Sequence, residues 1–258
     1  MRLLHLSDLH FGTETSFIKS ALLAHIREIP ADLVIISGDF TQTGSKAEFI
    51  KARTFLDELN LPTLCIPGNH DIPRFELIER FSNPYRKFKT YIAPDLSPVL
   101  RQGNVCIAGI TTARRALPHW NWANGSVSKQ QLKMLKTAYG KDEAKYRVCV
   151  MHHPVHQAEG NPLQTVVFGG RKALLALKGM KVDLVLTGHV HHASITTIED
   201  GGHNTVFLSA STALSTRLRT QKNGYNVVTF SEDSMLIEIF IHTDRGFICL
   251  EKLEVRTP

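Results

Sequence analysis

Short apolar runs alternate with longer amphipathic segments along the chain up to about residue 193. Six of these runs end in polar residues or glycine and have the length of buried strands. They are RLLHL (2–6), DLVIIS (32–37), PTLCIP (62–67), NVCIAGI (104–110), YRVCVMH (146–152) and DLVLTG (183–188). The segments between them predict helices over 15–29, 45–60, 128–139 and 170–179.

Two of the predicted helices begin with a capping box. Ser45 is followed three residues later by Glu48, and Ser128 is followed by Gln131. At this spacing the hydroxyl accepts from the third backbone N–H of the helix, and the longer side chain reaches back to the first residue. The pattern therefore predicts that helices start near residues 45 and 128.

After residue 193 the pattern changes to consecutive strands with Gly or Asn turns, namely ASITTIED, NTVFLSAS, YNVVTFS, SMLIEIFIH and FICLEKLEV. We predict a β-α-β front part and a mostly antiparallel rear part. No linker rich in Pro, Gly or Ser separates them, so we expect a single domain over residues 1–258. Two mixed sheets packed face to face, with helices on their outer faces, would bury the apolar faces of all these elements. The expected class is α/β (α+β), with a four-layer αββα double β-sandwich.

Residues 71–103 contain several prolines and fit poorly as core. We expect an excursion with helical turns that could form a cap over a site. Its mixture of aromatic and basic residues, FELIERF and YRKFKTYI, would suit a lipid or a base. An ordinary packed helical excursion is the alternative.

Composition limits the class of protein. Hydrophobic residues make up 43% of the chain and charged residues 21%, which is ordinary for a soluble protein. No apolar run approaches the roughly 18 residues needed to cross a bilayer, and His5 and Asp8 interrupt the N-terminal run, which argues against a signal peptide. The net charge of +6 mildly favours anionic partners, but no Lys/Arg block indicates a dedicated nucleic-acid site. Peripheral lipid contact stays open.

The four cysteines are far apart, and each lies in an apolar, strand-like run. They are Cys65, Cys106, Cys149 and Cys249. Reduced, buried thiols explain this pattern better than disulfides or a thiolate metal site, so we expect a cytoplasmic protein.

Polar side chains of metal-binding type follow five of the predicted strands. They are Asp8 and His10 in SDLH, Asp39 in SGDF, Asn69, His70 and Asp71 in PGNHD, His152 and His153 in MHHP, and His189 and His191 in TGHVH. Residues two apart on an extended chain point to the same side, and ligands gather at the carboxyl ends of strands in α/β sheets. The set contains oxygen and imidazole donors without sulfur, which suits Mn, Fe, Zn, Co or Ni. It is too large for one tetrahedral ion but suits two ions that share a carboxylate, as in sites for phosphoryl transfer.

The remaining histidines are interpreted as structural or surface residues. These are His5, His25, His119, His156, His203 and His242. His153 and His192 are adjacent to proposed ligands and are expected to point away, because neighbouring residues on an extended chain alternate in direction.

These five motifs, in this order over residues 7–191, resemble the signature of the calcineurin-like metallophosphoesterases. The resemblance implies a double β-sandwich flanked by helices and two divalent ions, Mn, Fe or Zn. It places one ion on Asp8, His10, Asp39 and His191 and the other on Asp39, Asn69, His152 and His189. His152 is preferred over His153 because the ligand in the family is usually the first His of such a pair.

The same resemblance implies a mechanism. A metal-bridging hydroxide would attack the phosphorus, and His70 would contact the phosphate and protonate the leaving alkoxide. Asp71 is expected to orient His70.

Within the family, HLSDLHFG, SGDFTQTGSKAEF and PGNHDIP are most similar to a bacterial branch of class III cyclic-nucleotide phosphodiesterases and glycerophosphodiesterases. This favours hydrolysis of a small phosphodiester, such as a cyclic nucleotide, a glycerophosphodiester or a phospholipid head group. Arg114, Arg217 and Arg219 are candidate substrate contacts, because guanidinium forks suit phosphate.

The sequence is compatible with three further possibilities. The same site could serve a phosphomonoesterase or a hydrolase of nucleotide or UDP-lipid pyrophosphates. A non-catalytic scaffold is the least favoured alternative. The strand-rich C-terminal part could offer an edge for a homodimer.

Overall fold

The computed structural model of the protein describes residues 1–140, 144–156, 165 and 167–256. The six strands predicted up to residue 193 are present as β1 (Arg2–Leu6), β2 (Leu33–Ile36), β3 (Thr63–Cys65), β5 (Val105–Ile110), β7 (Tyr146–Met151) and β9 (Leu184–Thr187). The four predicted helices are α1 (Ser16–Arg27), α2 (Lys46–Leu59), α5 (Lys129–Gly140) and α6 (Gly170–Gly179). The rear strands are β10 (Ser194–Asp200), β11 (His203–Ser209), β12 (Gly224–Phe230), β13 (Ser234–Thr243) and β14 (Gly246–Arg256).

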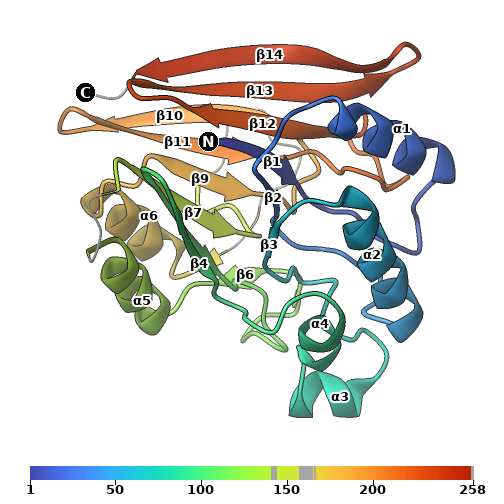
Figure 1. Ribbon diagram of the computed structural model, residues 1–258. Coiled ribbons are helices and arrows are strands. Elements are labelled where there is room, and N and C mark those ends of the chain that lie inside the picture. Colours follow the sequence, from blue (N-terminus) through green and yellow to red (C-terminus); the bar gives the residue numbers. More distant parts are fainter. Residues whose placement is uncertain (141–143, 157–164, 166, 257–258) are drawn as a thin grey trace.

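The strands form two six-stranded mixed sheets that pack face to face (Figure 1). The first sheet has the order β14-β13-β12-β1-β2-β3, and the second has the order β10-β11-β9-β7-β5-β4. Helices α1 and α2 cover the outer face of the first sheet, and α5 and α6 cover the outer face of the second. The predicted four-layer αββα arrangement is therefore confirmed. The rear strands divide between the sheets, because β10 and β11 extend the second and β12 to β14 extend the first.

Three apolar layers hold these elements together, and alternation along each strand assigns side chains to them. In β1, Leu3 faces the layer between the two sheets, whereas Leu4 and Leu6 face the layer under α1 and α2. Strands buried on both faces need continuous apolar runs, which explains why the central strands were visible in the sequence. Burying each large apolar side chain contributes about 1.5–3 kcal/mol.

Both predicted capping boxes are present. The Ser45 hydroxyl accepts from the backbone N–H of Glu48, and the Glu48 carboxylate accepts from the backbone N–H of Ser45. Ser128 and Gln131 make the same reciprocal pair at 3.2 and 2.9 Å. Glu48 also binds the backbone N–H of Thr43 at 2.9 Å, so the start of α2 is tied to the loop after β2.

The 71–103 excursion contains α3 (Leu77–Ser82), α4 (Arg86–Tyr91) and β4 (Val99–Gln102), so the predicted helical turns are confirmed. The expectation that it fits poorly as core was partly wrong. Phe88 is fully buried and packs with Ile92 into the layer under α2. Strand β4 was not predicted, and it pairs antiparallel with β5 at the edge of the second sheet.

The short strands β6 (Gly125–Ser126) and β8 (Val167–Phe168) form a separate parallel pair. Cys65, Cys106 and Cys149 are buried and, within the described residues, form no disulfide, as expected, while Cys249 is half-buried. Burial raises the pKa of the Cys65 and Cys149 thiols to about 12. Among the described residues, no helix has the length and hydropathy to cross a membrane.

His5 in β1 ties three strands of the first sheet together. Its Nε2 lies 2.9 Å from the Ser37 hydroxyl after β2, and the Asn226 amide in β12 donates to its Nδ1 at 3.2 Å. The ring is fully buried, and this burial lowers the pKa of His5 to about 3 against a partial opposing effect of Asp8.

We expect His5 to make the fold acid-sensitive. Because the folded-state pKa lies below the unfolded value of about 6.5, the stabilisation is present above pH 6.5 and is lost as the pH falls toward 3. Between pH 7 and pH 5 the free energy of unfolding should fall by about 2 kcal/mol from this group alone.

The measurement is denaturant unfolding at both pH values of the wild type and His5→Gln, each after metal removal. The variant should lose about 2 kcal/mol less than the wild type between the two pH values. Equal losses would show that His5 does not carry this pH dependence.

Candidate metal centre

The loops that follow β1, β2, β3, β7 and β9 meet at one point between the two sheets. Contacts between residues far apart in the chain define this meeting point. The backbone N–H of His189 donates to Asp8 Oδ2 at 2.8 Å, and His152 Nδ1 donates to the Ser37 carbonyl at 2.8 Å. The predicted convergence of the strand ends is what the structure shows.

A first group of four donor atoms consists of Asp8 Oδ1 and three atoms from His10, His191 and Asp39. His191 Nε2 lies 3.1 Å and His10 Nε2 lies 3.6 Å from Asp8 Oδ1. The two imidazole nitrogens are 3.0 Å apart, and Asp39 Oδ2 lies 3.7 Å from His10 Nε2. These are the side chains that the resemblance assigns to one ion.

A second group shares Asp39. Its Oδ2 lies 3.3 Å from His152 Nε2. Asn69 Oδ1 lies 3.2 Å from His152 Nε2 and 3.0 Å from His189 Nδ1. The two groups therefore have the Asp39 carboxylate in common, in the arrangement expected for a bridging ligand.

The spacing within both groups fits the ligand shell of a divalent ion. Metal–ligand distances of about 2.0–2.2 Å place neighbouring ligand atoms roughly 3–3.5 Å apart. Asp8 Oδ1 is buried and makes no hydrogen bond in the described part of the chain. An unsatisfied carboxylate oxygen is costly to bury, so this atom needs a cation.

Hydrogen bonds outside the groups orient the proposed ligands. His152 and His191 donate Nδ1–H to the carbonyls of Ser37 and Arg217, at 2.8 and 2.9 Å. A carbonyl can only accept, so Nδ1 keeps its proton, and in the neutral ring Nε2 offers its lone pair toward the site. This outer hydrogen bond is the usual support of a metal-binding histidine.

The backbone at these residues is strained. Seven non-glycine residues of the described chain have positive φ angles, and five of them are proposed ligands: Asp8, His10, Asp39, His189 and His191. Each such residue costs of order 1–3 kcal/mol and persists only where the surroundings enforce it. Sharp left-handed bends directly after the strands let residues two apart face the same point.

Two glycines allow the chain to pass close to the carboxylates. A Cβ on Gly68 would collide with Asp39 Oδ1, and a Cβ on Gly188 would collide with Asp8 Oδ2 and the Ser7 hydroxyl. The glycines in PGNHD and TGHVH therefore make room for the site.

His70 stands beside the two groups without belonging to the metal sets that the resemblance implies. Its Nδ1–H donates to the Gln42 carbonyl at 2.7 Å, which leaves the Nε2 lone pair facing Arg217 Nη1 at 3.5 Å. Burial lowers the pKa of His70 against the opposing charge of Asp39. The ring is therefore neutral at neutral pH.

Asp71 was expected to orient His70, but the ring is held by Gln42 instead. The buried Asp71 carboxylate accepts from the backbone N–H groups of Thr41 and Gly68, at 3.0 and 2.9 Å. Burial, with Asp39 nearby, raises its pKa to about 7. Asp71 thus fixes the loops that carry Asp39 and His70.

Charge partners shift the ionisation of the ligands. Burial alone would favour the neutral forms of Asp8 and Asp39, but the surrounding imidazoles hold both carboxyl pKa values well below the ordinary range. Burial opposes the charge on His152, yet Asp39 outweighs it and raises the pKa of His152 to about 9. Burial lowers the pKa of His189 well below its usual value.

His153 was expected to point away, but the centroid of its ring lies 4.4 Å from that of His189, and His152, His153 and His189 have ligand atoms within 4.8 Å of one another. His153 Nε2 donates to the Ala123 carbonyl at 2.8 Å, and the Thr112 hydroxyl lies 2.7 Å from its Nδ1. Both of its nitrogens are occupied, which supports His152 as the ligand. His192 Nδ1 bonds to the Thr220 hydroxyl near the surface.

The three candidate arginines differ in position. Arg217 is exposed and lies beside His70. Arg114 donates to the carbonyls of Thr111, Ala113 and Ser126 and to Gln131, so its guanidinium is committed to the protein. Arg219 is exposed but does not line the cavity beside His70.

That cavity holds about 340 Å³. Its lining comes from five separate parts of the chain: Gln42, Asn69, His70, Ile72, Arg74, Arg80, Trp122, Ala123 and Arg217. Gln42, Arg74, Arg80 and Trp122 were not predicted as site residues. No short motif marks them. Gln42 and Arg74 lie in the loops after β2 and β3, whereas α3 brings Arg80 and the 111–124 segment brings Trp122 to the site.

Arg80 is an unusual component of this cavity, because it is only 8% exposed and has no carboxylate partner among the described residues. Its Nε and Nη1 donate to the carbonyls of Arg115 and Pro73, and the Trp122 ring lies 5.3 Å from its guanidinium carbon. A cation–π contact contributes about 0.5–2 kcal/mol. Burying an ion costs several kcal/mol, which these contacts offset, while Nη2 has no hydrogen-bond partner among the described residues.

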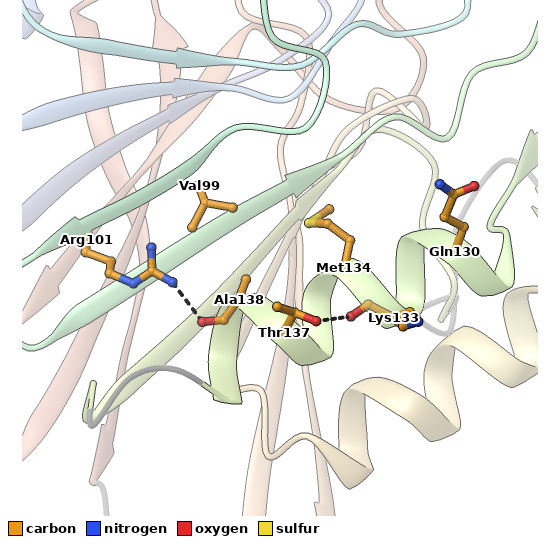
Figure 2. A pocket seen from close by; sticks show the side chains of 7 residues that line it. All are labelled: Val99, Arg101, Gln130, Lys133, Met134, Thr137 and Ala138. Atoms are coloured by element: carbon orange, nitrogen blue, oxygen red, sulfur yellow. Dashed lines mark hydrogen bonds between the residues drawn. The ribbon is translucent and has the colours of Figure 1, made fainter.

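A different hollow, of about 560 Å³, lies between β4 and α5 (Figure 2). Its lining includes Met134, Ala138 and the aliphatic part of Lys133, and Arg101 donates across it to the Ala138 carbonyl at 2.9 Å. The described residues of its lining include no histidine or carboxylate, so its size does not make it a catalytic site.

Comparison with known proteins agrees with this geometry. The chain is 25% identical over 195 residues to a probable cyclic nucleotide phosphodiesterase of Ruthia magnifica subsp. Calyptogena magnifica, covering 74% of this chain and 76% of that protein. It is 30% identical over 173 residues to a probable glycerophosphodiester phosphodiesterase, GpdQ, of Arcobacter nitrofigilis, covering 64% and 58%.

Among solved structures, a dimetal phosphatase from Danio rerio has the same fold, with a TM-score of 0.69 at 15% identity over 100% of this chain and 99% of that one. The family model described as calcineurin-like phosphoesterase matches residues 1–193, which contain all the proposed metal ligands. The chain belongs to the calcineurin-like phosphoesterase family, and it is a metal-dependent hydrolase of phosphoesters.

Proposed function

We propose that the protein is a phosphodiesterase that hydrolyses a small phosphodiester at two divalent ions. The observation that carries this proposal is the pair of donor groups joined through Asp39, with His70 and Arg217 at their rim. The names of the relatives support a diester substrate. The cavity beside His70 also has room for a second ester group.

The residues fit two ions. Asp8, His10, Asp39 and His191 would hold one ion, and Asp39, Asn69, His152 and His189 would hold the other. When bound, such a pair lowers the pKa of a coordinated water toward 7 and stabilises charge on phosphoryl oxygens. The family uses two divalent metals, and the acidic and histidine side chains here form groups able to bind them. Which of Mn, Fe or Zn occupies the site depends on the availability of each ion in the cell as well as on the ligand set.

Charge in the ligand set favours an anionic substrate. Only Asp8 and Asp39 carry negative charge, while Asn69 and the imidazoles are neutral ligands. Two divalent ions with two carboxylates would keep a net charge of about +2, which attracts a phosphoester anion.

His70 and Arg217 would act on the substrate directly. The Gln42 carbonyl fixes the ring of His70, so that Nε2 faces the rim of the site. A phosphate bound between Arg217 and His70 would raise the pKa of the ring, because negative charge favours the imidazolium. The ring would then donate the proton from Nε2 to the leaving alkoxide.

We expect His70→Gln to lower kcat most for poor leaving groups. For a dithymidine monophosphate substrate, whose leaving group is an alkoxide, the loss should be about 10²–10⁴-fold. For bis-p-nitrophenyl phosphate, whose leaving group needs no proton, the loss should be smaller. Steady-state kinetics with both substrates tests this, with metal content checked for each protein. Equal losses would remove the proton-donor role.

We expect the number of bound metal ions to depend on the second group of ligands, which includes Asn69. Equilibrium dialysis against Mn²⁺ followed by elemental analysis should find two ions per wild-type chain. Asn69→Ala should lower the occupancy toward one, because it removes a ligand of only one ion. The matched control is Arg86→Gln, because Arg86 is exposed and its guanidinium pairs with Glu79. One ion in the wild type at saturation would refute the two-ion site.

We expect metal affinity to fall with acid. His152 must lose its proton to coordinate, and its pKa of about 9 means that the metal displaces a proton at neutral pH. Each unit decrease in pH below 9 should weaken binding about tenfold for this proton. Calorimetry in buffers of different ionisation enthalpy, from pH 6 to pH 8.5, would count the released protons. Affinity that does not change with pH would contradict this assignment.

Hydrolysis of monoesters or pyrophosphates on the same site is the alternative. Specificity constants for a monoester, a diester and a nucleotide pyrophosphate, measured in one assay, separate these activities. A marked preference for pyrophosphates would replace the diester proposal.

A further inference from the structure

The cavity beside His70 is strongly cationic. Three arginines line it, namely Arg74, Arg80 and Arg217, and no carboxylate is among the described residues of its lining. We call this cavity the arginine pocket. If the proposed function holds, the scissile phosphate lies at the ions, so the arginine pocket receives another part of the substrate.

Arg80 lies at the buried side of the arginine pocket. An arginine stays protonated in proteins, so its charge has to be compensated. Two carbonyls and the Trp122 ring satisfy Nε, Nη1 and one face of the guanidinium. Within the described chain, Nη2 makes no hydrogen bond, and no carboxylate lies within ion-pair distance. An anion in the cavity would supply both a hydrogen-bond acceptor for Nη2 and a negative charge for the guanidinium.

Arg74 and Arg217 add charge at the exposed side. The guanidinium of Arg74 lies over the Phe75 ring at 5.4 Å and makes no ion pair in the part of the chain described here. Arg217 donates to the Gln42 side chain at 3.1 Å and lies next to His70. By contrast, Arg86 and Lys87 on the neighbouring α4 are both paired with Glu79. Acidic partners are available in this region, but none is among the described residues that line the arginine pocket.

We propose that the arginine pocket binds a second anionic group of the substrate, a phosphate or a carboxylate, carried by the ester group that lies beside His70. Guanidinium groups bind such oxyanions through paired, charge-assisted hydrogen bonds. Arg217 lies closest to the reaction and serves the scissile phosphate, while Arg74 and Arg80 hold the second anion. The substrate class narrows to phosphodiesters that bear a further negative charge.

Arg80 also has a structural role, because its hydrogen bonds join α3 to the 113–122 segment. Tyr85 strengthens the same junction by donating to the Ala113 carbonyl at 2.6 Å. A variant of Arg80 could therefore lose binding by losing structure. Arg74 has an exposed side chain without hydrogen bonds in the described chain. A substitution of Arg74 therefore tests the effect of its charge on binding without removing structural contacts.

The test is calorimetric binding to the Mn²⁺-loaded protein of thymidine 5′-phosphate and thymidine 3′,5′-bisphosphate, which differ by one phosphate. The wild type should bind the bisphosphate at least tenfold more tightly. Arg74→Gln should reduce this preference about threefold to tenfold and leave the affinity for the monophosphate unchanged. Arg86→Gln, whose guanidinium lies outside the arginine pocket, should keep the full preference.

Two further measurements complete the test. 3′-O-succinyl thymidine 5′-phosphate carries a carboxylate instead, and a preference for it over the bisphosphate would assign a carboxylate as the natural group. Arg80→Gln, with its thermal unfolding measured, should lose the preference even where its melting temperature is close to that of the wild type.

Equal affinity of the wild type for one and two anionic groups would overturn the proposal. A preference unchanged in Arg74→Gln and in a folded Arg80→Gln would also overturn it. Turnover of bis-p-nitrophenyl phosphate is measured separately. If no diester is hydrolysed, the proposed activity fails while the binding preference still decides the role of the arginine pocket.

Discussion

The proposed metal centre depends on one carboxylate, that of Asp39, which is shared between two groups of ligands. Asp39 leaves the first sheet after β2, gives Oδ1 to the backbone N–H of His70 and presents Oδ2 to His10 and His152. His152 comes from the second sheet. Asp39 therefore joins the two halves of the sandwich electrostatically, at a point where neither half alone has enough ligands for two ions.

Holding the Asp39 carboxylate in place requires backbone strain that destabilises the folded state. Five left-handed, non-glycine residues at about 1–3 kcal/mol each amount to a cost similar to the net stability of a typical domain, which is about 5–15 kcal/mol. The three apolar layers enforce the strand ends, because each central strand is buried on both faces. Metal binding would repay part of the strain, since an ion that binds only the folded chain stabilises it.

The sequence was enough to predict those elements of the fold that hydrophobic periodicity or a local capping motif determines. Continuous apolar runs marked the central strands, and the Ser45 and Ser128 capping boxes marked two helix starts. Strand β4 was not predicted because an edge strand of four residues with two polar positions has no clear alternation. Phe88 was missed as a core residue because its neighbours are charged, and tertiary packing, including the contact of its ring with that of Phe40, buries it.

The same division applies to the site. The proposed ligands stand in short motifs at strand ends, so the amino-acid pattern alone was enough to group them. Arg80 and Trp122 are far apart in the chain and meet only because α3 docks on the 111–124 segment. The hydrogen-bond partner of His70 was predicted as a side chain, Asp71, but it is a main-chain carbonyl, that of Gln42. Main-chain partners have no residue-type signal, so sequence motifs cannot reveal them.

The electrostatics of the rim suggest how acid catalysis and substrate binding are linked. Burial and the nearby positive charge of Arg217 both lower the pKa of His70, so the free enzyme holds a neutral ring. An anion placed between these two residues removes the repulsion and creates the need for a proton on Nε2. The proton would then be taken up as the substrate binds, and His70 would become an acid only where a leaving group is present to receive it.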